Sequence, residues 1–220
     1  MKTLIFSDSH LTHQFDEKKF NYLRRIISSS DQVIINGDFW DGFIISFDQF
    51  FNSKWSKLFP LLKSKKTIYI FGNHDSQRLN DLDRIKHFSD IQSMSHTFIE
   101  RGKTFTIEHG QRYFPTELKN VDINSAFFRS ICKFVKYTEK TIVRIFGEKY
   151  QKLLKKNNAK LKKHIGQNSD GSYFIFGHTH SPEVDLSMNF INSGIICHGL
   201  AQYVIIQDGN IEIIKDRYDR

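Results

Sequence analysis

The sequence is poor in cysteine and lacks long hydrophobic runs. Its two cysteines, Cys132 and Cys197, lie far apart in 220 residues, so no disulfide framework is expected. No uninterrupted apolar stretch approaches the roughly 20 residues that a transmembrane helix needs. Repeats and low-complexity linkers are also missing, and the chain opens directly on a strand-like run, so no signal peptide is predicted. These absences favour a single domain over residues 1–220, located in the cytoplasm.

Near-continuous apolar and β-branched runs predict strands that are buried on both faces. Four such runs cover residues 3–6, 33–35, 67–71 and 173–176. A hairpin is predicted for 97–100 and 103–108 around Arg101-Gly102, and two further strands for 203–206 and 211–214 around a turn at 208–210.

Helices are predicted between the strands. Asp16 is a candidate N-cap for a helix that reaches about Ser29. Residues 47–62 predict a second helix, whose end Pro60 leaves open, and residues 81–88 predict a short third one. This order predicts an α/β fold, a sandwich of two mixed β-sheets flanked by helices.

Five short polar patches follow the strand-like runs or lie within them. They are Asp8-Ser9-His10, Gly37-Asp38-Phe39-Trp40-Asp41, Gly72-Asn73-His74-Asp75, His109-Gly110 and Gly177-His178-Thr179-His180. At the carboxyl ends of core strands loops converge, and a glycine there lets the backbone turn where a Cβ would obstruct it. Carboxylates, an amide and imidazoles suit a pair of first-row transition metals better than one structural zinc, which favours thiolates. The sequence thus predicts a metal centre that hydrolyses a phosphate ester or anhydride.

These patches match, in order, the motifs D-x-H, G-D-x-x-D, G-N-H-[DE], H and G-H-x-H, and through them the chain resembles the calcineurin-like metallophosphoesterases. The resemblance runs from Thr3 to about His180 and implies the same two-sheet fold. It implies two divalent transition-metal ions, with Mn²⁺ expected first and Fe, Zn or Ni as alternatives. One ion would be held by Asp8, His10, Asp38 and His180, and the other by Asp38, Asn73, His109 and His178, so that Asp38 bridges them.

The charge of such a centre suits a phosphate substrate. Two divalent ions against Asp8, Asp38 and one bridging hydroxide leave a net charge of roughly +1, which attracts an oxyanion. By the resemblance, the hydroxide attacks phosphorus while His74, which is not a ligand, acts as general acid on the leaving oxygen. Asp41 would orient His74 and raise its pKa. Asp41 and Asp75 could instead cap the helices that follow them.

A helical cap insertion is predicted at about 118–165, where apolar residues recur at three- and four-residue spacings and Gly147 is a possible break. The segment holds thirteen Lys and Arg against three acids. One interpretation is a helical pair packed on the core with a solvated lysine-rich face. The other is a basic amphipathic cap that contacts an anionic membrane, at the inner membrane face, and admits a membrane-borne substrate.

The insertion and the opening from Asp8 to Leu11 resemble the UDP-2,3-diacylglucosamine pyrophosphohydrolases, which implies a nucleotide-lipid substrate cleaved at its diphosphate. The chain departs from that branch at His74, where arginine is common. A soluble phosphomonoesterase or phosphodiesterase, acting on cyclic nucleotides or on nucleic acid, is the alternative. The aromatics of the insertion are at core spacing, which disfavours a nucleic-acid platform. A catalytically silent protein-binding scaffold is the alternative of another class, and the complete ligand set disfavours it.

Overall fold

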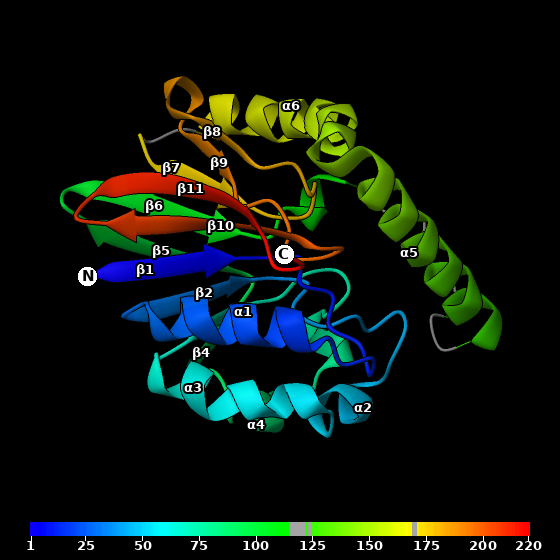
Figure 1. The fold of residues 1–220 in the computed structure, drawn as a ribbon. Helices are drawn as coiled ribbons and strands as arrows, with labels where there is room; N and C mark the ends of the chain where they lie inside the picture. The colour runs from blue at the N-terminus through cyan, green and yellow to red at the C-terminus, as the bar shows by residue number, and fades with distance from the viewer. Residues whose placement is uncertain (115–121, 123–124, 169–170) are drawn as a thin grey trace.

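The computed structural model describes residues 1–114, 122, 125–168 and 171–220, and it forms two stacked β-sheets between helices (Figure 1). The first sheet has the order β11-β10-β1-β2-β3-β4 and the second the order β5-β6-β7-β9-β8. Helices α1 to α4 lie over the first sheet and α6 over the second (Figure 1). The predicted sandwich of two mixed sheets flanked by helices is confirmed.

The first sheet is built around four parallel strands. These are β1 (Lys2–Phe6), β2 (Gln32–Asn36), β3 (Ile68–Ile70) and β4 (Ile91–Ser93). The long hairpin of β10 (Leu200–Gln207) and β11 (Asn210–Arg217) pairs antiparallel with β1 and completes the sheet. Because β1 to β3 run in one direction, the loops that follow them all leave from one edge.

The second sheet joins the predicted hairpin to three short strands. The hairpin consists of β5 (Ser95–Glu100) and β6 (Lys103–Glu108), and β6 pairs in parallel with β7 (Tyr173–Phe176). Next to β7 follow β9 (Phe190–Asn192) and, at the edge, β8 (Glu183–Asp185). Isoleucines from the inner faces of both sheets, among them Ile5, Ile34, Ile107 and Ile175, form the core between the sheets.

Helix α1 (Glu17–Ser28) begins and ends where the sequence predicts. The Asp16 side chain accepts a hydrogen bond from the Lys19 backbone nitrogen at 3.1 Å and so caps the helix. Leu23 and Ile27 then face the first sheet as part of its outer core. The short α4 (Leu82–Ile85) lies within the predicted 81–88 and is capped by Asp81.

The single helix predicted for residues 47–62 is wrong. The segment forms α2 (Phe47–Phe51), the 3₁₀ helix η1 (Lys54–Leu58) and α3 (Phe59–Ser64). Asn52 bonds back to the Asp48 carbonyl, and the Ser53 hydroxyl accepts from the Trp55 nitrogen, so local side-chain bonds end one helix and start the next. Pro60 lies in the first turn of α3, where a missing N–H costs nothing.

The insertion is helical and breaks at Gly147, as predicted, while its predicted start at Leu118 lies outside the described residues. It consists of α5 (Ala126–Phe146), the 3₁₀ helix η5 (Gly147–Tyr150) and α6 (Gln151–Asn168). The two helices diverge at Gly147, and α5 extends along the side of the sandwich (Figure 1). Among the described residues, no helix combines the length and apolarity needed to cross a bilayer.

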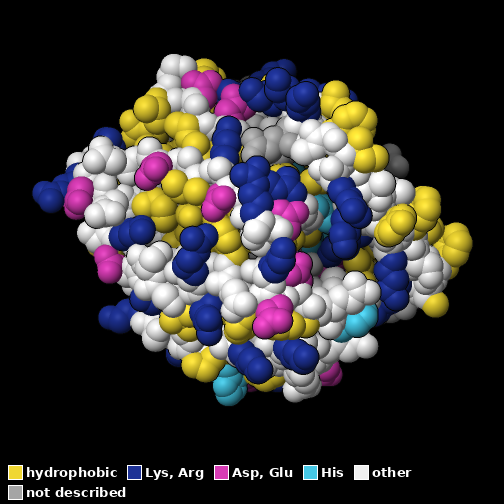
Figure 2. All heavy atoms as spheres, viewed as in Figure 1, with side chains coloured by type: hydrophobic (Ala, Val, Ile, Leu, Met, Phe, Trp, Pro, Cys, Tyr) yellow, Lys and Arg dark blue, Asp and Glu magenta, His cyan; other side chains and the backbone are white. Residues whose placement is uncertain are grey.

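Most apolar residues of α5 do not pack on the core, contrary to the core spacing expected for them. Phe127, Phe134 and Ile145 are 77%, 68% and 68% exposed, and only Val143 of this helix is fully buried. Figure 2 shows hydrophobic side chains gathered along the edge that α5 forms, with Lys and Arg beside them. The periodicity gave the helix and its stripe, but the stripe points away from the protein.

Candidate metal centre

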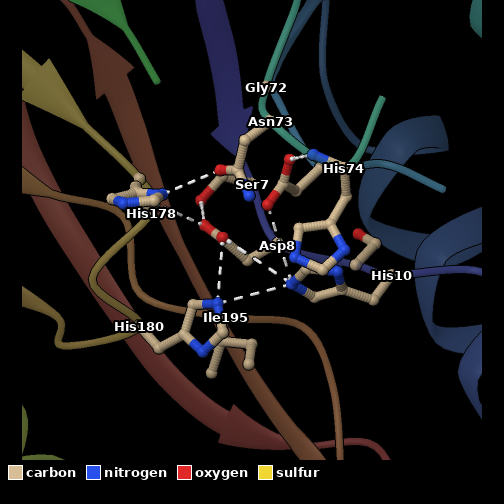
Figure 3. A network of polar contacts seen from close by, with 12 residues as sticks. Ser7, Asp8, His10, Gly72, Asn73, His74, His178, His180 and Ile195 are labelled. Atoms are coloured by element: carbon tan, nitrogen blue, oxygen red, sulfur yellow. Dashed lines mark hydrogen bonds and ion pairs between the residues drawn. The ribbon is translucent and has the colours of Figure 1, made fainter. Parts of the chain in front are cut away.

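The polar patches meet where the parallel strands of both sheets end. Asp8 and His10 follow β1, Asp38 follows β2, Asn73 and His74 follow β3, His109 follows β6, and His178 and His180 follow β7. Figure 3 shows Asp8 among His10, His178 and His180, with Asn73 and His74 on the adjoining loop. The sandwich brings all seven predicted ligands and the predicted acid to one place.

Asp8, His10 and His180 form the first cluster. The Nε2 atom of His180 lies 3.1 Å from Asp8 Oδ1 and 3.4 Å from His10 Nε2, and His10 Nε2 lies 3.9 Å from the same carboxylate oxygen. These donor atoms lie within 4.8 Å of one another, which is the spacing of ligands around one ion. Asp38 Oδ2 lies 3.9 Å from His10 Nε2 and can join this cluster.

Asp38 also reaches the second cluster through His109. Asp38 Oδ2 lies 3.3 Å from His109 Nε2, and Asp8 Oδ1 lies 4.0 Å from it. His109 Nδ1 lies 2.8 Å from the Asn36 carbonyl oxygen, to which it can only donate, so Nε2 is the nitrogen that faces the carboxylates and could bind an ion. The position of Asp38 between His10 and His109 is the one that a bridging ligand requires.

Asn73 and His178 lie on the side of His109 but contact each other. The distance from Asn73 Oδ1 to His178 Nδ1 is 2.9 Å, and the rings of His109 and His178 are 5.3 Å apart. Both side chains therefore border the second cluster, and their ligand atoms form a mutual hydrogen bond. An ion there would have to replace that bond.

The donor set fits metal ions because two of its buried ligand atoms make no hydrogen bond within the described part of the chain. Asp8 Oδ1 and His109 Nε2 are buried without a hydrogen-bond partner among the described residues. A buried polar atom left unpaired costs about 1–3 kcal/mol, so such atoms are retained where something else binds them. Oxygen and imidazole donors around shared carboxylates match the preferences of divalent first-row metals.

The backbone holds these residues in a conformation that few residues adopt. Asp8, His10, Asp38, His178 and His180 all have positive φ, from 44° to 63°. Outside glycine, the left-handed region is sparsely populated and is tolerated best by Asn, Asp and His. Residues with such backbone angles concentrate at functional sites, and no sequence pattern predicted these angles here.

Gly72 is needed for contact between the loops that carry the ligands. A Cβ at this position would lie 2.6 Å from the Asp38 backbone nitrogen and would also strike its carboxylate. The close approach lets the His74 backbone nitrogen donate to Asp38 Oδ1 at 2.8 Å. The glycine predicted to prevent obstruction beside the ligands therefore does so.

Asp75, a candidate helix cap, does not cap the helix that follows it. Its buried carboxylate accepts hydrogen bonds from the backbone nitrogens of Asp38, Phe39 and Gly72 at 3.0, 2.7 and 2.8 Å, and from the Tyr69 hydroxyl. It thus ties the loop after β2 to the loop after β3. The sequence showed an acid at the right place but not its backbone partners.

His74 lies beside the first cluster and is oriented by Asp41. Its Nδ1 lies 2.9 Å from Asp41 Oδ1, the contact that the sequence predicted, and its ring is 4.5 Å from that of His10. Burial alone would lower the pKa of His74, but the charges of Asp38 and Asp41 outweigh it and raise that pKa. The raised pKa favours the protonated imidazole next to the candidate metal centre.

Two residues of α5 reach the site, and sequence reasoning missed both. Lys136 Nζ donates to Asp41 Oδ2 at 2.9 Å and to the His10 carbonyl oxygen at 2.8 Å. Glu139 Oε1 lies 3.2 Å from His180 Nδ1, so this carboxylate can orient the imidazole whose Nε2 is a candidate metal ligand. They are three residues apart on the side of α5 opposite its apolar stripe, which is the signal that could have identified them.

The electrostatics of the site favour bound cations. Burial lowers the pKa of His109, but Asp38 and Asp8 outweigh it and raise that pKa to about 9. By contrast, burial lowers the pKa of His10 to about 3 and that of His178 to about 4, so both imidazoles are neutral, as metal ligands must be.

Comparison with known proteins gives one family. The model for calcineurin-like phosphoesterases matches residues 1–182. No curated protein sequence matches the chain. Among solved structures, an archaeal phosphodiesterase has 20% sequence identity and a TM-score of 0.52, over 98% of this chain and 99% of that one.

Two further structures are more distant. YfcE, a phosphoesterase from E. coli, has 14% identity and a TM-score of 0.49, over 97% of this chain and 98% of that one. Zinc-bound Vps29 from Entamoeba histolytica has 13% identity and a TM-score of 0.47, over 99% of both chains. At 20% identity, the archaeal phosphodiesterase shows a shared fold alone. The family match, which spans most of the sequence, carries the assignment: the chain belongs to the calcineurin-like phosphoesterases and is a hydrolase of phosphoric esters.

Proposed function

We propose that the chain cleaves a phosphodiester or phosphoanhydride bond with two divalent metal ions, manganese first among them, and with His74 as the general acid. The observation that carries this proposal is that the candidate metal ligands and the candidate general acid are separate groups in the site. Asp8 and His109 bring buried, unsatisfied atoms close to the Asp38 carboxylate, whereas His74 lies beside them and is bound to Asp41 instead.

The residues that would hold the ions are those the sequence singled out. Asp8, His10, Asp38 and His180 would hold one ion, and Asp38, Asn73, His109 and His178 the other. When bound, the two ions would lower the pKa of a water between them and neutralise charge on the phosphate oxygens. Asp38 lies close to both clusters and would be the ligand that the two ions share.

His74 supplies what the metal donors cannot. Its Nδ1–H is committed to Asp41, so Nε2 is the atom that can give a proton to the leaving oxygen as the bond to phosphorus breaks. Lys136 binds the other oxygen of Asp41 and fixes that carboxylate in place. The protonated imidazole is thus available without any change in the loop.

The test is hydrolysis of bis-p-nitrophenyl phosphate by the manganese-loaded protein, together with the metal content of each chain. We expect turnover and two ions per chain. Asp38→Asn removes one negative charge from between the ions and should abolish both. Two ions per chain in an active Asp38→Asn protein would refute the bridging role.

We further propose a lipid-linked diphosphate, of the UDP-2,3-diacylglucosamine type, as the substrate presented at an anionic membrane. The exposed apolar stripe of α5, which includes Phe134 and Ile145, supports this. Exposed lysines of α6, among them Lys155, Lys160 and Lys163, supply the positive charge that anionic headgroups attract. The net positive charge of the insertion disfavours a second copy of this chain as the partner that covers the stripe.

Sedimentation with vesicles that contain phosphatidylglycerol tests the membrane contact. We expect the protein to bind them at low salt and Phe134→Ser/Ile145→Ser to lose more than about tenfold in affinity, because each buried apolar side chain contributes about 1.5–3 kcal/mol. Phosphatidylcholine vesicles are the control for charge. If the unmodified protein binds neither kind of vesicle, a soluble phosphoester becomes the favoured substrate.

A further inference from the structure

A cavity of about 1010 Å³ opens beside the candidate metal centre. It lies between α5, the segment from His10 into the start of α1, and the end of β11. His10 belongs both to its wall and to the first metal cluster, so the cavity and the reaction centre are continuous. The size is that of a pocket for a small organic ligand rather than for a single phosphate group.

The wall of this cavity is strongly basic. It includes seven Lys and Arg against three acids, Asp16, Glu17 and Asp219. Two of these acids are already engaged, because Asp219 pairs with Arg217 at 2.7 Å and Asp16 caps α1. The positive charge that remains is concentrated on α5.

Lys133, Lys136, Lys140 and Arg144 are spaced by three and four residues and so form one strip along α5, which faces the cavity. Lys136 connects the strip with the reaction centre, because it donates hydrogen bonds to the Asp41 carboxylate and to the His10 carbonyl oxygen. Among the described residues, Lys133, Lys140 and Arg144 have no acid within ion-pair distance. Their charges remain available to a ligand.

The orientation of α5 argues against a merely solvated strip. A surface helix ordinarily turns its apolar face inward and its charges outward. Here Phe134 and Ile145 point outward, while Lys136 is only 24% exposed and the cationic strip lines a concavity. Figure 2 shows the surface hollowed beside α5, with Lys and Arg along the rim.

We propose that this cavity is a subsite for a second phosphate group of the substrate, bound by Lys133, Lys140 and Arg144 while the scissile phosphate lies at the metal centre. The inference rests on the proposed function, and it narrows the substrate to compounds with two phosphates. Ammonium and guanidinium groups on one concave wall are the donors that phosphate oxygens bind best. Lys136 belongs to the strip and also contacts Asp41 and His10, and so it would set the orientation between the two phosphates.

The experiment compares two esters on the manganese-loaded protein. Adenosine 5′-(p-nitrophenyl phosphate) has one phosphate, and the p-nitrophenyl ester of adenosine diphosphate has two. We expect Lys133→Glu/Lys140→Glu/Arg144→Glu to raise KM for the diphosphate ester at least about 30-fold, since each bond to a charged group contributes about tenfold or more. KM for the monophosphate ester should change less than about threefold.

Lys149→Glu/Lys152→Glu/Lys156→Glu is the matched control, because it reverses three exposed charges of the same insertion outside the cavity. It should leave both KM values nearly unchanged. Equal effects of the two triple variants, or equal effects of the cavity variant on both esters, would refute the subsite.

A binding measurement separates this proposal from the proposed function. Inorganic pyrophosphate is titrated calorimetrically into the full chain kept in EDTA, with folding checked by circular dichroism. Without metal ions the carboxylates repel pyrophosphate from the reaction centre, so binding that only the cavity variant loses supports the subsite. No hydrolysis of either ester, with this binding intact, would refute the proposed function alone. Absence of binding by the unmodified chain would refute the subsite alone.

Discussion

Replacing Asp75 should cost far more stability than its sequence context suggests. In Asp75→Ala, three buried backbone N–H groups, those of Asp38, Phe39 and Gly72, lose their acceptor, and so does the Tyr69 hydroxyl. Each buried donor left unsatisfied costs about 1–3 kcal/mol, and water entering the space recovers part of it. We expect a loss of about 4 kcal/mol in the free energy of unfolding.

Asp75→Asn is the graded variant. Its amide keeps one oxygen, which can serve Asp38 and Gly72, while its nitrogen meets the Phe39 N–H and leaves that donor unsatisfied. The Tyr69 hydroxyl can turn to accept from the new amide. One lost donor predicts a loss of about 1–2 kcal/mol.

Urea unfolding in EDTA, followed by circular dichroism, measures these losses without a contribution from metal binding. Asp16→Ala is the control, since it removes a carboxylate that accepts one backbone bond at an exposed helix start and should cost about 1 kcal/mol. If Asp75→Ala were no less stable than Asp16→Ala, the hydrogen bonds of Asp75 between the two ligand loops would not contribute the stability predicted for them.

Three further outcomes follow from the site. His74→Ala should keep both metals but slow an alkyl phosphate ester by about 10²–10⁴, and a nitrophenyl ester much less; equal losses in steady-state assays would exclude acid catalysis. His74 works in its protonated form, so kcat/KM should fall as pH rises through the pKa of His74. Asp41 raises that pKa and Lys136 lowers it. The fall should therefore move to lower pH in Asp41→Asn and to higher pH in Lys136→Met. Shifts of the same sign in the pH profiles would contradict this. Glu139→Gln should weaken manganese binding by about 10–100-fold in a chelator competition, and unchanged affinity would mean that Glu139 does not position His180.

The sequence predicted most of what determines the position of the site. The buried strands β1 and β2 have apolar centres, residues 4–6 and 33–35, so their ends and the polar patches after them could be identified directly. The cap at Asp16 is a local signal, and it marked the start of α1 correctly. Features that depend on neighbours close in the chain were therefore accessible.

The remaining features depend on contacts between distant segments. The apolar stripe of α5 has a clear period, but the side it faces is decided by Lys136 and Glu139, which bind groups from Asp41 and His180. Asp75 similarly gains its role from backbone nitrogens of another loop. The break at Asn52 comes from side-chain bonds to the backbone that compete with an otherwise continuous helix.

The left-handed backbone of five candidate ligands has an evolutionary consequence. At about 1–2 kcal/mol for each residue, Asp8, His10, Asp38, His178 and His180 together oppose folding by an amount comparable to the 5–15 kcal/mol net stability of a typical protein. Glycine would relieve that strain at every one of them. Selection for stability alone would therefore favour glycine at these positions, and only selection for activity would keep the five ligands there.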